Sequence, residues 1–192
     1  MSSPAIEFKI LVFSLSTLWG LWETRGGMRD RHISAGTKSD RGSFLGLYLA
    51  ISVGNLAATF LSFKGVAPLS HHWTFAFVGL TLMVGAFLFR WRSMRVLARY
   101  FTHRLTIQED HRLITSGPYR WIRHPSYLGI LLLMLGIGLA LTDAWSIAIA
   151  TLPVLAAVSY RIALEERALV DHFGEEYARY CTRTRRLIPF VW

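Results

Sequence analysis

The 192-residue chain is 53% hydrophobic and only 17% charged, whereas a soluble domain carries about 25% charged residues. Its hydrophobic residues form long blocks, which membrane spans explain better than a single soluble core does. A formal net charge of +9 is compatible with nucleic-acid binding. The basic residues lie between the apolar blocks, however, and form no basic face with interleaved aromatic residues. We therefore expect a membrane protein without a nucleic-acid partner.

Several kinds of catalytic or metal site are excluded by missing motifs. The single cysteine, Cys181, excludes an intramolecular disulfide framework and a CxxC metal site, and we interpret it as incidental. None of the seven histidines has HExxH spacing, so we expect no metal. The sequence contains no P-loop and no GxGxxG motif of a soluble nucleotide-binding domain. Ser126 lacks the GxSxG setting of a hydrolase nucleophile.

Five apolar stretches predict an all-α, polytopic membrane bundle of about five transmembrane helices. They are residues 8–22, 44–63, 73–91, 127–141 and 145–162. About 20 helical residues cross the hydrocarbon, so the second, third and fifth stretches are long enough. The first and fourth are short, and we expect them to begin earlier, to tilt or to lie in a thinned bilayer. Pro125 suits the first turn of the fourth helix. No cleavage site follows the first stretch, which predicts a retained span.

The distribution of basic residues predicts the topology. The connections after the first, third and fifth stretches are rich in arginine, whereas the connection after the second contains only Lys64 and the link around Asp143 contains none. The positive-inside rule places the N-terminus outside and the C-terminus in the cytoplasm. We expect an integral, multi-pass membrane protein with a cytosolic active site, in the inner membrane if the source is prokaryotic. Most tryptophans lie near the ends of the stretches, as interface anchors do.

The first polar segment with residues suited to binding or catalysis is residues 103–127, HRLTIQEDHRLITSGPYRWIRHPSY. Gly117 and Pro118 favour a tight turn. Irregular backbone near a membrane is tolerated only where protein or water forms hydrogen bonds with its polar groups. Amides left free by a turn, flat aromatic rings and a helix N-terminus at Pro125 suit a small ligand that carries a carboxylate. A single histidine here would be a simple interface residue, but three in one bent segment favour a pocket.

The second polar segment is residues 160–192, which opens with Arg161, Glu165 and Glu166. Arg161 and Glu165 are four residues apart and share a helical face, where an exposed ion pair contributes about 0.2–0.5 kcal/mol. Ionisable residues at a membrane boundary are energetically costly, so we interpret this pair as functional. The pattern also predicts a helix break at residues 172–174, a new helix from 175 to 180 and an apolar plug at the C-terminus.

Two long motifs carry a family resemblance. HRLITSGPYRWIRHPSYLG, followed one hairpin later by RIALEERALVDHFGEEYARYCTRTRRLIPFVW, resembles the isoprenylcysteine carboxyl methyltransferase family. The resemblance covers about residues 100–192, and the earlier spans match only in hydropathy. It implies a helical membrane enzyme that binds S-adenosylmethionine in a cytosol-facing pocket and releases S-adenosylhomocysteine. We accordingly divide the chain into N-terminal spans, residues 1–92, and a methyltransferase half, residues 93–192, with a small cytosolic cap that binds the cofactor.

The resemblance also implies roles for single residues. Arg161 would meet the substrate carboxylate, and Glu165 would hold the cofactor. Methyl transfer from a sulfonium cation to a carboxylate needs no general base, so alignment, worth about 7–11 kcal/mol, is expected to matter most. We expect Arg161 to position the substrate carboxylate more than to activate it, because too strong an interaction would lower the nucleophilicity of the carboxylate oxygen. The other implied cofactor contacts are His111, Arg112, Leu113, Ile114, Tyr119, His124, Pro125, Ser126 and Tyr127.

The implied substrate is a prenylated cysteine or a similar lipid-linked carboxylate, with membrane lipids around it. The short chain is typical of a compact prokaryotic-type member, for which prenylated proteins are not the expected substrate. Three alternatives stay open. A phospholipid N-methyltransferase is disfavoured because Arg161 would repel an ethanolamine ammonium, whereas the phosphate of NADPH in a reductase of the sterol-reductase type would suit the basic loop. The third alternative is a non-enzymatic membrane subunit.

Overall fold

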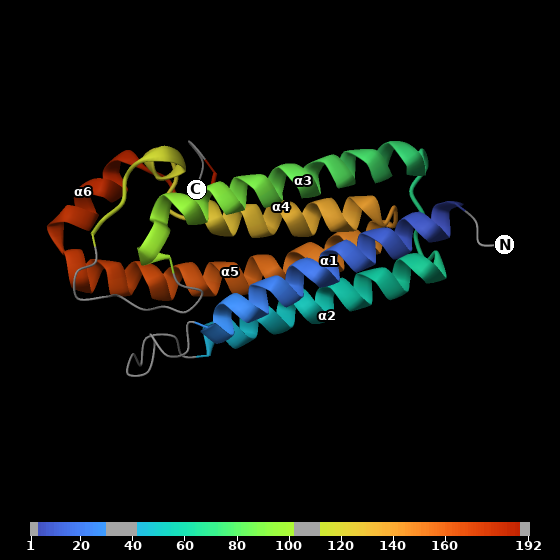
Figure 1. Ribbon diagram of the computed structural model, residues 1–192, viewed down its shortest axis with the longest axis horizontal. Coiled ribbons are helices and arrows are strands. Elements are labelled where there is room, and N and C mark those ends of the chain that lie inside the picture. Colours follow the sequence, from blue (N-terminus) through green and yellow to red (C-terminus); the bar gives the residue numbers. More distant parts are fainter. Residues whose placement is uncertain (1–3, 30–41, 102–111, 189–192) are drawn as a thin grey trace.

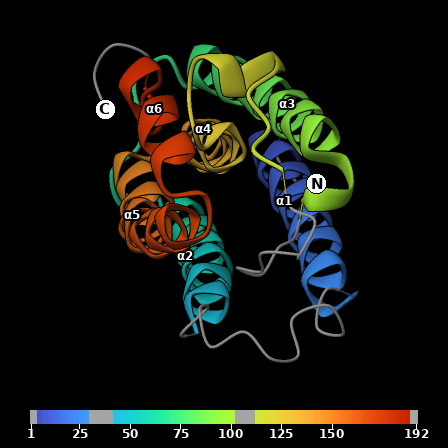
Figure 2. The same ribbon diagram turned by 90° about the vertical axis from the view of Figure 1, so that its left-hand side faces the viewer.

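The computed structural model describes residues 4–29, 42–101 and 112–188, which fold into an elongated helical bundle (Figure 1). The long helices are α1 (Pro4–Arg29), α2 (Ser43–Lys64), α3 (His72–Leu97), α4 (Pro125–Ala140) and α5 (Ala144–Phe173). The shorter elements are η1 (Ala98–Tyr100), η2 (Gly117–Arg120) and α6 (Glu175–Arg183). Figure 2 looks onto one end of the bundle and shows α4 between α3 and α5, with α6 beside the end of α5. The predicted all-α fold is confirmed.

Among the described helices, α1, α2, α3 and α5 are long and apolar enough to cross a membrane. The first predicted span begins earlier than its apolar stretch, as expected. Helix α1 starts at Pro4 and is 26 residues long. The fourth span stays short, since α4 has 16 residues and is roughly 24 Å long. The fifth apolar stretch ends at Ile162, and α5 continues past it to Phe173, where the break was predicted at residues 172–174. These helices confirm a polytopic membrane bundle.

Short local signals set the ends of α4 and α5. Pro125 occupies the first turn of α4, where its missing N–H costs nothing. Asp143 caps α5 by accepting a hydrogen bond from the backbone N–H of Ser146 at 3.1 Å. The Asp143 carboxylate also accepts from the N–H of Ala67 at 2.7 Å, so this cap holds the α2–α3 connection at the same end. The predicted break after α5 is confirmed at Gly174, whose φ is +52°.

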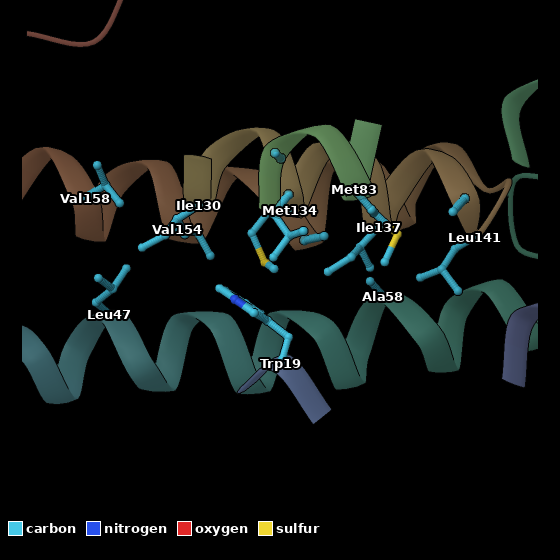
Figure 3. Packing of buried hydrophobic residues seen from close by; sticks show 14 of the residues in the cluster. Trp19, Leu47, Ala58, Met83, Ile130, Met134, Ile137, Leu141, Val154 and Val158 are labelled. Atoms are coloured by element: carbon cyan, nitrogen blue, oxygen red, sulfur yellow. The ribbon is translucent and has the colours of Figure 1, made fainter. Parts of the chain in front are cut away.

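The interior of the bundle is filled by side chains from helices α1 to α5. Figure 3 shows Trp19 of α1 pointing into the same core as Met134 and Ile137 of α4 and Val154 of α5. The outward face of α2 is apolar as well as exposed, as expected for a surface that faces lipid. Its exposed residues include Leu45, Leu49, Val53, Leu56 and Phe60.

Helices α3 and α4 pack backbone against backbone at Gly79. A Cβ atom there would lie 2.6 Å from the carbonyl oxygen of Gly136 and would also meet the backbone of Ala140. Small residues at such a crossing let transmembrane helices approach closely. We expect Gly79→Ala to force the helices apart and to destabilise the protein by about 1–3 kcal/mol, the range for overpacking, measured as a lower thermal midpoint in detergent.

Gly85 provides the matched control for this change. It lies on the same helix, and nothing lies within 4 Å of the position of an added Cβ atom. Gly85→Ala is expected to leave the midpoint unchanged or to raise it, because alanine favours the helix by about 1 kcal/mol over glycine. Equal destabilisation by both changes would show that the crossing at Gly79 is not tight.

The two polar segments lie at the same end of the bundle. Residues 112–124 and α6 gather where α1, α3 and α5 end and where α2 and α4 begin (Figure 1). The topology predicted from the basic residues requires this arrangement. The cytosolic orientation of this end stays a prediction, and so does the division of the chain at residue 92.

Candidate active site

A tyrosine from α4 joins the two ionisable residues predicted on α5. The Nε of Arg161 donates to the hydroxyl oxygen of Tyr127 at 2.7 Å, and this hydroxyl donates to Oε2 of Glu165 at 2.8 Å. The i, i+4 relation expected from the sequence is present, and Tyr127 bridges it. His124 completes the group, since its Nδ1 lies 3.9 Å from Oε1 of Glu165. We call these four residues the α4–α5 polar cluster.

The guanidinium group of Arg161 is held by three helices. Arg161 is 2% exposed, and its Nη1 donates to the hydroxyl of Ser43, the first residue of α2, at 2.9 Å. A buried cation needs such partners, because burial without them is costly. Counted from Ala144, Arg161 lies roughly 26 Å along α5, near the far side of hydrocarbon about 30 Å thick. The arrangement fixes the plane of a cation close to the membrane boundary, which suits recognition of a carboxylate.

Glu166, the next residue along α5, binds two arginine side chains outside the polar cluster. Its Oε1 accepts from Nε of Arg123 at 2.9 Å, and its Oε2 accepts from Nε of Arg186 at 2.9 Å. Nη2 of Arg186 forms an ion pair with the same oxygen at 2.8 Å. The hydrogen bonds to Glu166 raise the pKa of Arg186 above its usual value. Neighbouring residues on an α-helix point about 100° apart, so Glu165 lies against Tyr127 and Glu166 against the two arginines. His124 lies near both glutamates, with Nδ1 3.9 Å from Glu165 and Nε2 3.5 Å from Glu166.

The C-terminal residues 184–187, here called the C-terminal strap, pair with the segment that leads into α4. The N–H of Arg123 donates to the carbonyl of Arg185 at 2.7 Å, and the N–H of His124 donates to the carbonyl of Arg186 at 3.0 Å. Leu187 is buried behind this pairing, with 2% exposure. The strap therefore fixes the backbone of His124, which belongs to the α4–α5 polar cluster.

Helix α6 supports the same segment from the side. The hydroxyl of Tyr180 donates to the carbonyl of Tyr119 at 2.6 Å. Burial raises the pKa of Tyr180, so this hydroxyl remains a neutral donor. Burial also raises the pKa of the Cys181 thiol, which disfavours a reactive thiolate. Both observations fit a supporting role for α6.

Removing the charge of Glu166 should loosen the strap. In Glu166→Gln, Arg123 and Arg186 lose their anionic partner. We expect destabilisation of about 3 kcal/mol at most, the low end for breaking a buried pair, because the side chain of Arg186 is 41% exposed. The measurement is the thermal midpoint in detergent. Glu175→Gln is the control, because the 3.7 Å pair of Glu175 with Arg179 lies on the surface and should contribute nothing measurable. A similar midpoint for both variants would contradict this role of Glu166.

Some of the predicted site residues lie together in the polar cluster, and others lie outside it. His124, Tyr127, Arg161 and Glu165 meet in the polar cluster, next to Pro125. Ser126 is buried, and its hydroxyl accepts a hydrogen bond from Arg90 of α3. The remaining predicted residues lie before α4: Tyr119 is buried, Leu113 and Ile114 are half-buried, Arg112 is exposed, and His111 lies outside the described residues.

The sequence interpretation missed several residues of this region. Ser43 precedes the second apolar stretch and was assigned no role, and Arg123 and Arg186 were used only as topology signals. Glu166 was noted as a neighbour of Glu165, and the pairing of Glu23 with Arg90 was not anticipated. One signal was available for Glu166. A carboxylate at the end of a span needs a partner, and arginines occur in both polar segments, before α4 and after α6.

Comparison with known proteins decides the family of the chain. A sequence model of the isoprenylcysteine carboxyl methyltransferase (ICMT) family matches residues 77–171. Protein-S-isoprenylcysteine O-methyltransferase B of Arabidopsis thaliana is 33% identical over 147 residues, which are 76% of this chain and 73% of the plant protein. The chain belongs to the isoprenylcysteine carboxyl methyltransferase family.

Other members of the ICMT family extend the comparison. Protein-S-isoprenylcysteine O-methyltransferase of Saccharomyces cerevisiae is 34% identical over 101 residues, covering 52% of this chain and 42% of the yeast protein. A probable protein-S-isoprenylcysteine O-methyltransferase of Oryza sativa subsp. japonica is 34% identical over 125 residues, covering 64% and 65%. A solved structure of the eukaryotic intramembrane Ras methyltransferase ICMT covers 96% of this chain and 68% of its own, with a TM-score of 0.63 and 21% identity. That structure supports the fold.

The ICMT match confirms the resemblance and extends it. The family match begins at Phe77 in α3, whereas the sequence motifs indicated a start near residue 100. It therefore includes α3 as well as the hairpin of α4 and α5. Membership of this family favours neither a phospholipid N-methyltransferase nor a membrane reductase.

Proposed function

We propose that the chain transfers a methyl group from S-adenosylmethionine to the carboxylate of a prenylated cysteine or a similar lipid-linked carboxylate. The observation that carries the proposal is the buried guanidinium of Arg161, oriented by Ser43 and Tyr127 and linked through Tyr127 to Glu165. Family membership supports the reaction class, because the named relatives are protein-S-isoprenylcysteine O-methyltransferases.

The residues of the polar cluster fit the amino-acid part of S-adenosylmethionine. Nε2 of His124 is buried without a hydrogen bond within the described ranges, and Oε1 of Glu166 lies 3.5 Å from it. The Glu165 side chain is 30% exposed and its carboxylate is fixed by Tyr127. A small molecule that carries both an ammonium and a carboxylate would satisfy these groups. When bound, S-adenosylmethionine supplies an electrophilic methyl group attached to a sulfonium.

Arg161 then acts as the positioning cation for the acceptor carboxylate. Its guanidinium plane is set by hydrogen bonds to Tyr127 and Ser43, so its orientation does not depend on the substrate. A preorganised cation aligns a carboxylate at little entropic cost. The carboxylate is already ionised near neutral pH, which is why the cluster needs no general base. His124 and Tyr127 contribute hydrogen bonds and exclude water.

The location of the polar cluster suits a lipid-linked acceptor and a water-soluble donor. The cluster lies at the end of the bundle where α4 begins and where residues 112–124 and α6 gather, and both of these segments contain arginines. We propose that this end faces the cytoplasm, as the positive-inside rule indicates. A carboxylate at the headgroup level and a cofactor from the cytosol would then meet at the same boundary, while the lipid chain stays in the bilayer.

The decisive experiment supplies methyl-labelled S-adenosylmethionine to the full chain, purified in detergent. A farnesylcysteine analogue and phosphatidylethanolamine are offered as acceptors, and titration calorimetry measures binding of S-adenosylhomocysteine and NADPH. We expect a base-labile labelled ester of the prenylcysteine and micromolar binding of S-adenosylhomocysteine. Label in the phospholipid would identify an N-methyltransferase, and binding of NADPH alone would identify a reductase. Binding of neither compound would favour a non-enzymatic subunit.

A further inference from the structure

A second buried arginine lies outside the polar cluster, on α3. Arg90 is 5% exposed, and the Glu23 side chain on α1 is 12% exposed. Nε and Nη2 of Arg90 donate to the two carboxylate oxygens of Glu23, both at 2.7 Å. Nη1 donates to the backbone carbonyl of Ser126 at 2.9 Å and to its hydroxyl. One guanidinium group therefore joins α1, α3 and the first turn of α4.

This arrangement specifies a geometry more than it stabilises the bundle. Desolvation of two charges offsets most of their attraction, and apolar residues of similar volume hold helices together as well or better. The bidentate fork, in contrast, fixes the guanidinium plane. Glu23 therefore determines the direction in which the third nitrogen of Arg90 points, which is toward Ser126.

A glycine on α4 makes the approach of Arg90 possible. A Cβ atom on Gly129 would lie 2.6 Å from Cβ of Arg90 and 3.1 Å from its Cα. Gly129 follows Ser126 by three residues, so it lies on the same face of α4. The backbone of α3 thus comes close enough for the Arg90 side chain to run along α4 to its first turn.

The first turn of α4 carries the bridging group of the polar cluster. Ser126 precedes Tyr127, whose hydroxyl connects Arg161 with Glu165. Arg90 holds Ser126 through a backbone atom, so displacement of this contact shifts the backbone that carries Tyr127. The geometry points to Arg90, oriented by Glu23, as a positioning residue that sets the place of Tyr127 for methyl transfer. This inference rests on the proposed function, and it gives the N-terminal helix α1 a part in the site.

A double-mutant cycle tests whether Arg90 acts through Tyr127. Arg90→Met should lower kcat/KM for the prenylcysteine analogue about tenfold in the wild-type background and less than about threefold in Tyr127→Phe, because coupled residues are not additive. Glu23→Gln should show the same dependence, and Arg90→Lys should recover part of the loss. Arg92→Met, at an exposed position on the same helix, is the control and should keep full activity. Equal losses in both backgrounds would reduce Arg90 to a structural role.

Hydrogen–deuterium exchange gives a readout that does not need activity. Arg90→Met should speed exchange at the first turn of α4, residues 125–130, whereas Arg92→Met should not. Unchanged exchange at this turn would overturn the inference even if the wild-type protein methylates prenylcysteine. Inactive wild-type protein with altered exchange in Arg90→Met would instead refute the proposed reaction and leave the positioning contact in place.

Discussion

Arg161→Ala is expected to remove methyl transfer while leaving the affinity for S-adenosylhomocysteine unchanged. The side chain supplies the fixed cation that aligns the acceptor carboxylate, and we expect kcat to fall by about a hundredfold or more, equal to about 2.7 kcal/mol. Cofactor affinity should survive, because the hydrogen bond from Tyr127 to Glu165 does not involve Arg161. Turnover of the prenylcysteine analogue and calorimetry with S-adenosylhomocysteine measure the two effects separately.

Two further variants separate charge from geometry at this position. Arg161→Lys keeps the charge but loses the planar fork, so we expect an intermediate rate. Ser43→Ala removes one hydrogen bond from Nη1 of Arg161 and should have a smaller effect than either change at Arg161. Turnover of Arg161→Ala at the wild-type rate would exclude Arg161 from the reaction. Loss of S-adenosylhomocysteine binding in Arg161→Ala would instead place Arg161 at the cofactor.

Local sequence signals predicted the helices well because their physical causes are local. Long apolar blocks predicted the spans, Pro125 predicted the start of α4, and the sequence around Gly174 predicted the break between α5 and α6. Each of these depends on a few neighbouring residues. At the end of α5 the apolar stretch stops at Ile162, whereas the predicted helix break lies at residues 172–174. The helix itself continues to Phe173.

The partners of the site residues depend on how the helices are rotated, which hydropathy does not reveal. A helix that is apolar on all sides gives little indication of the face that it presents to its neighbours. The sequence thus placed Arg161 and Glu165 on one face of α5 but did not identify Tyr127 as the group between them. For the same reason, the contact of Arg90 with Glu23 on α1 and Ser126 on α4 became visible only in the structure.

Substitutions of the two adjacent glutamates of α5 are expected to affect different properties, cofactor affinity for Glu165 and thermal stability for Glu166. Glu165→Ala should weaken binding of S-adenosylhomocysteine by about ten- to a hundredfold, the equivalent of about 1.5–3 kcal/mol for a hydrogen bond to a charged group, and should keep the thermal midpoint. Its carboxylate is 30% exposed and lies in the polar cluster, whereas the Glu166 side chain, 13% exposed, holds the C-terminal strap.

Calorimetry and thermal unfolding of Glu165→Ala and Glu166→Gln, taken together, test this division. Glu166→Gln should lower the midpoint and affect cofactor binding only through the looser strap, so added S-adenosylhomocysteine should restore part of its stability. The Glu165 variant should gain much less from the same ligand. Wild-type affinity in Glu165→Ala would contradict the assignment, because the carboxylate would then serve only to fix the hydroxyl of Tyr127, and the cofactor would have to be held by the segment before α4.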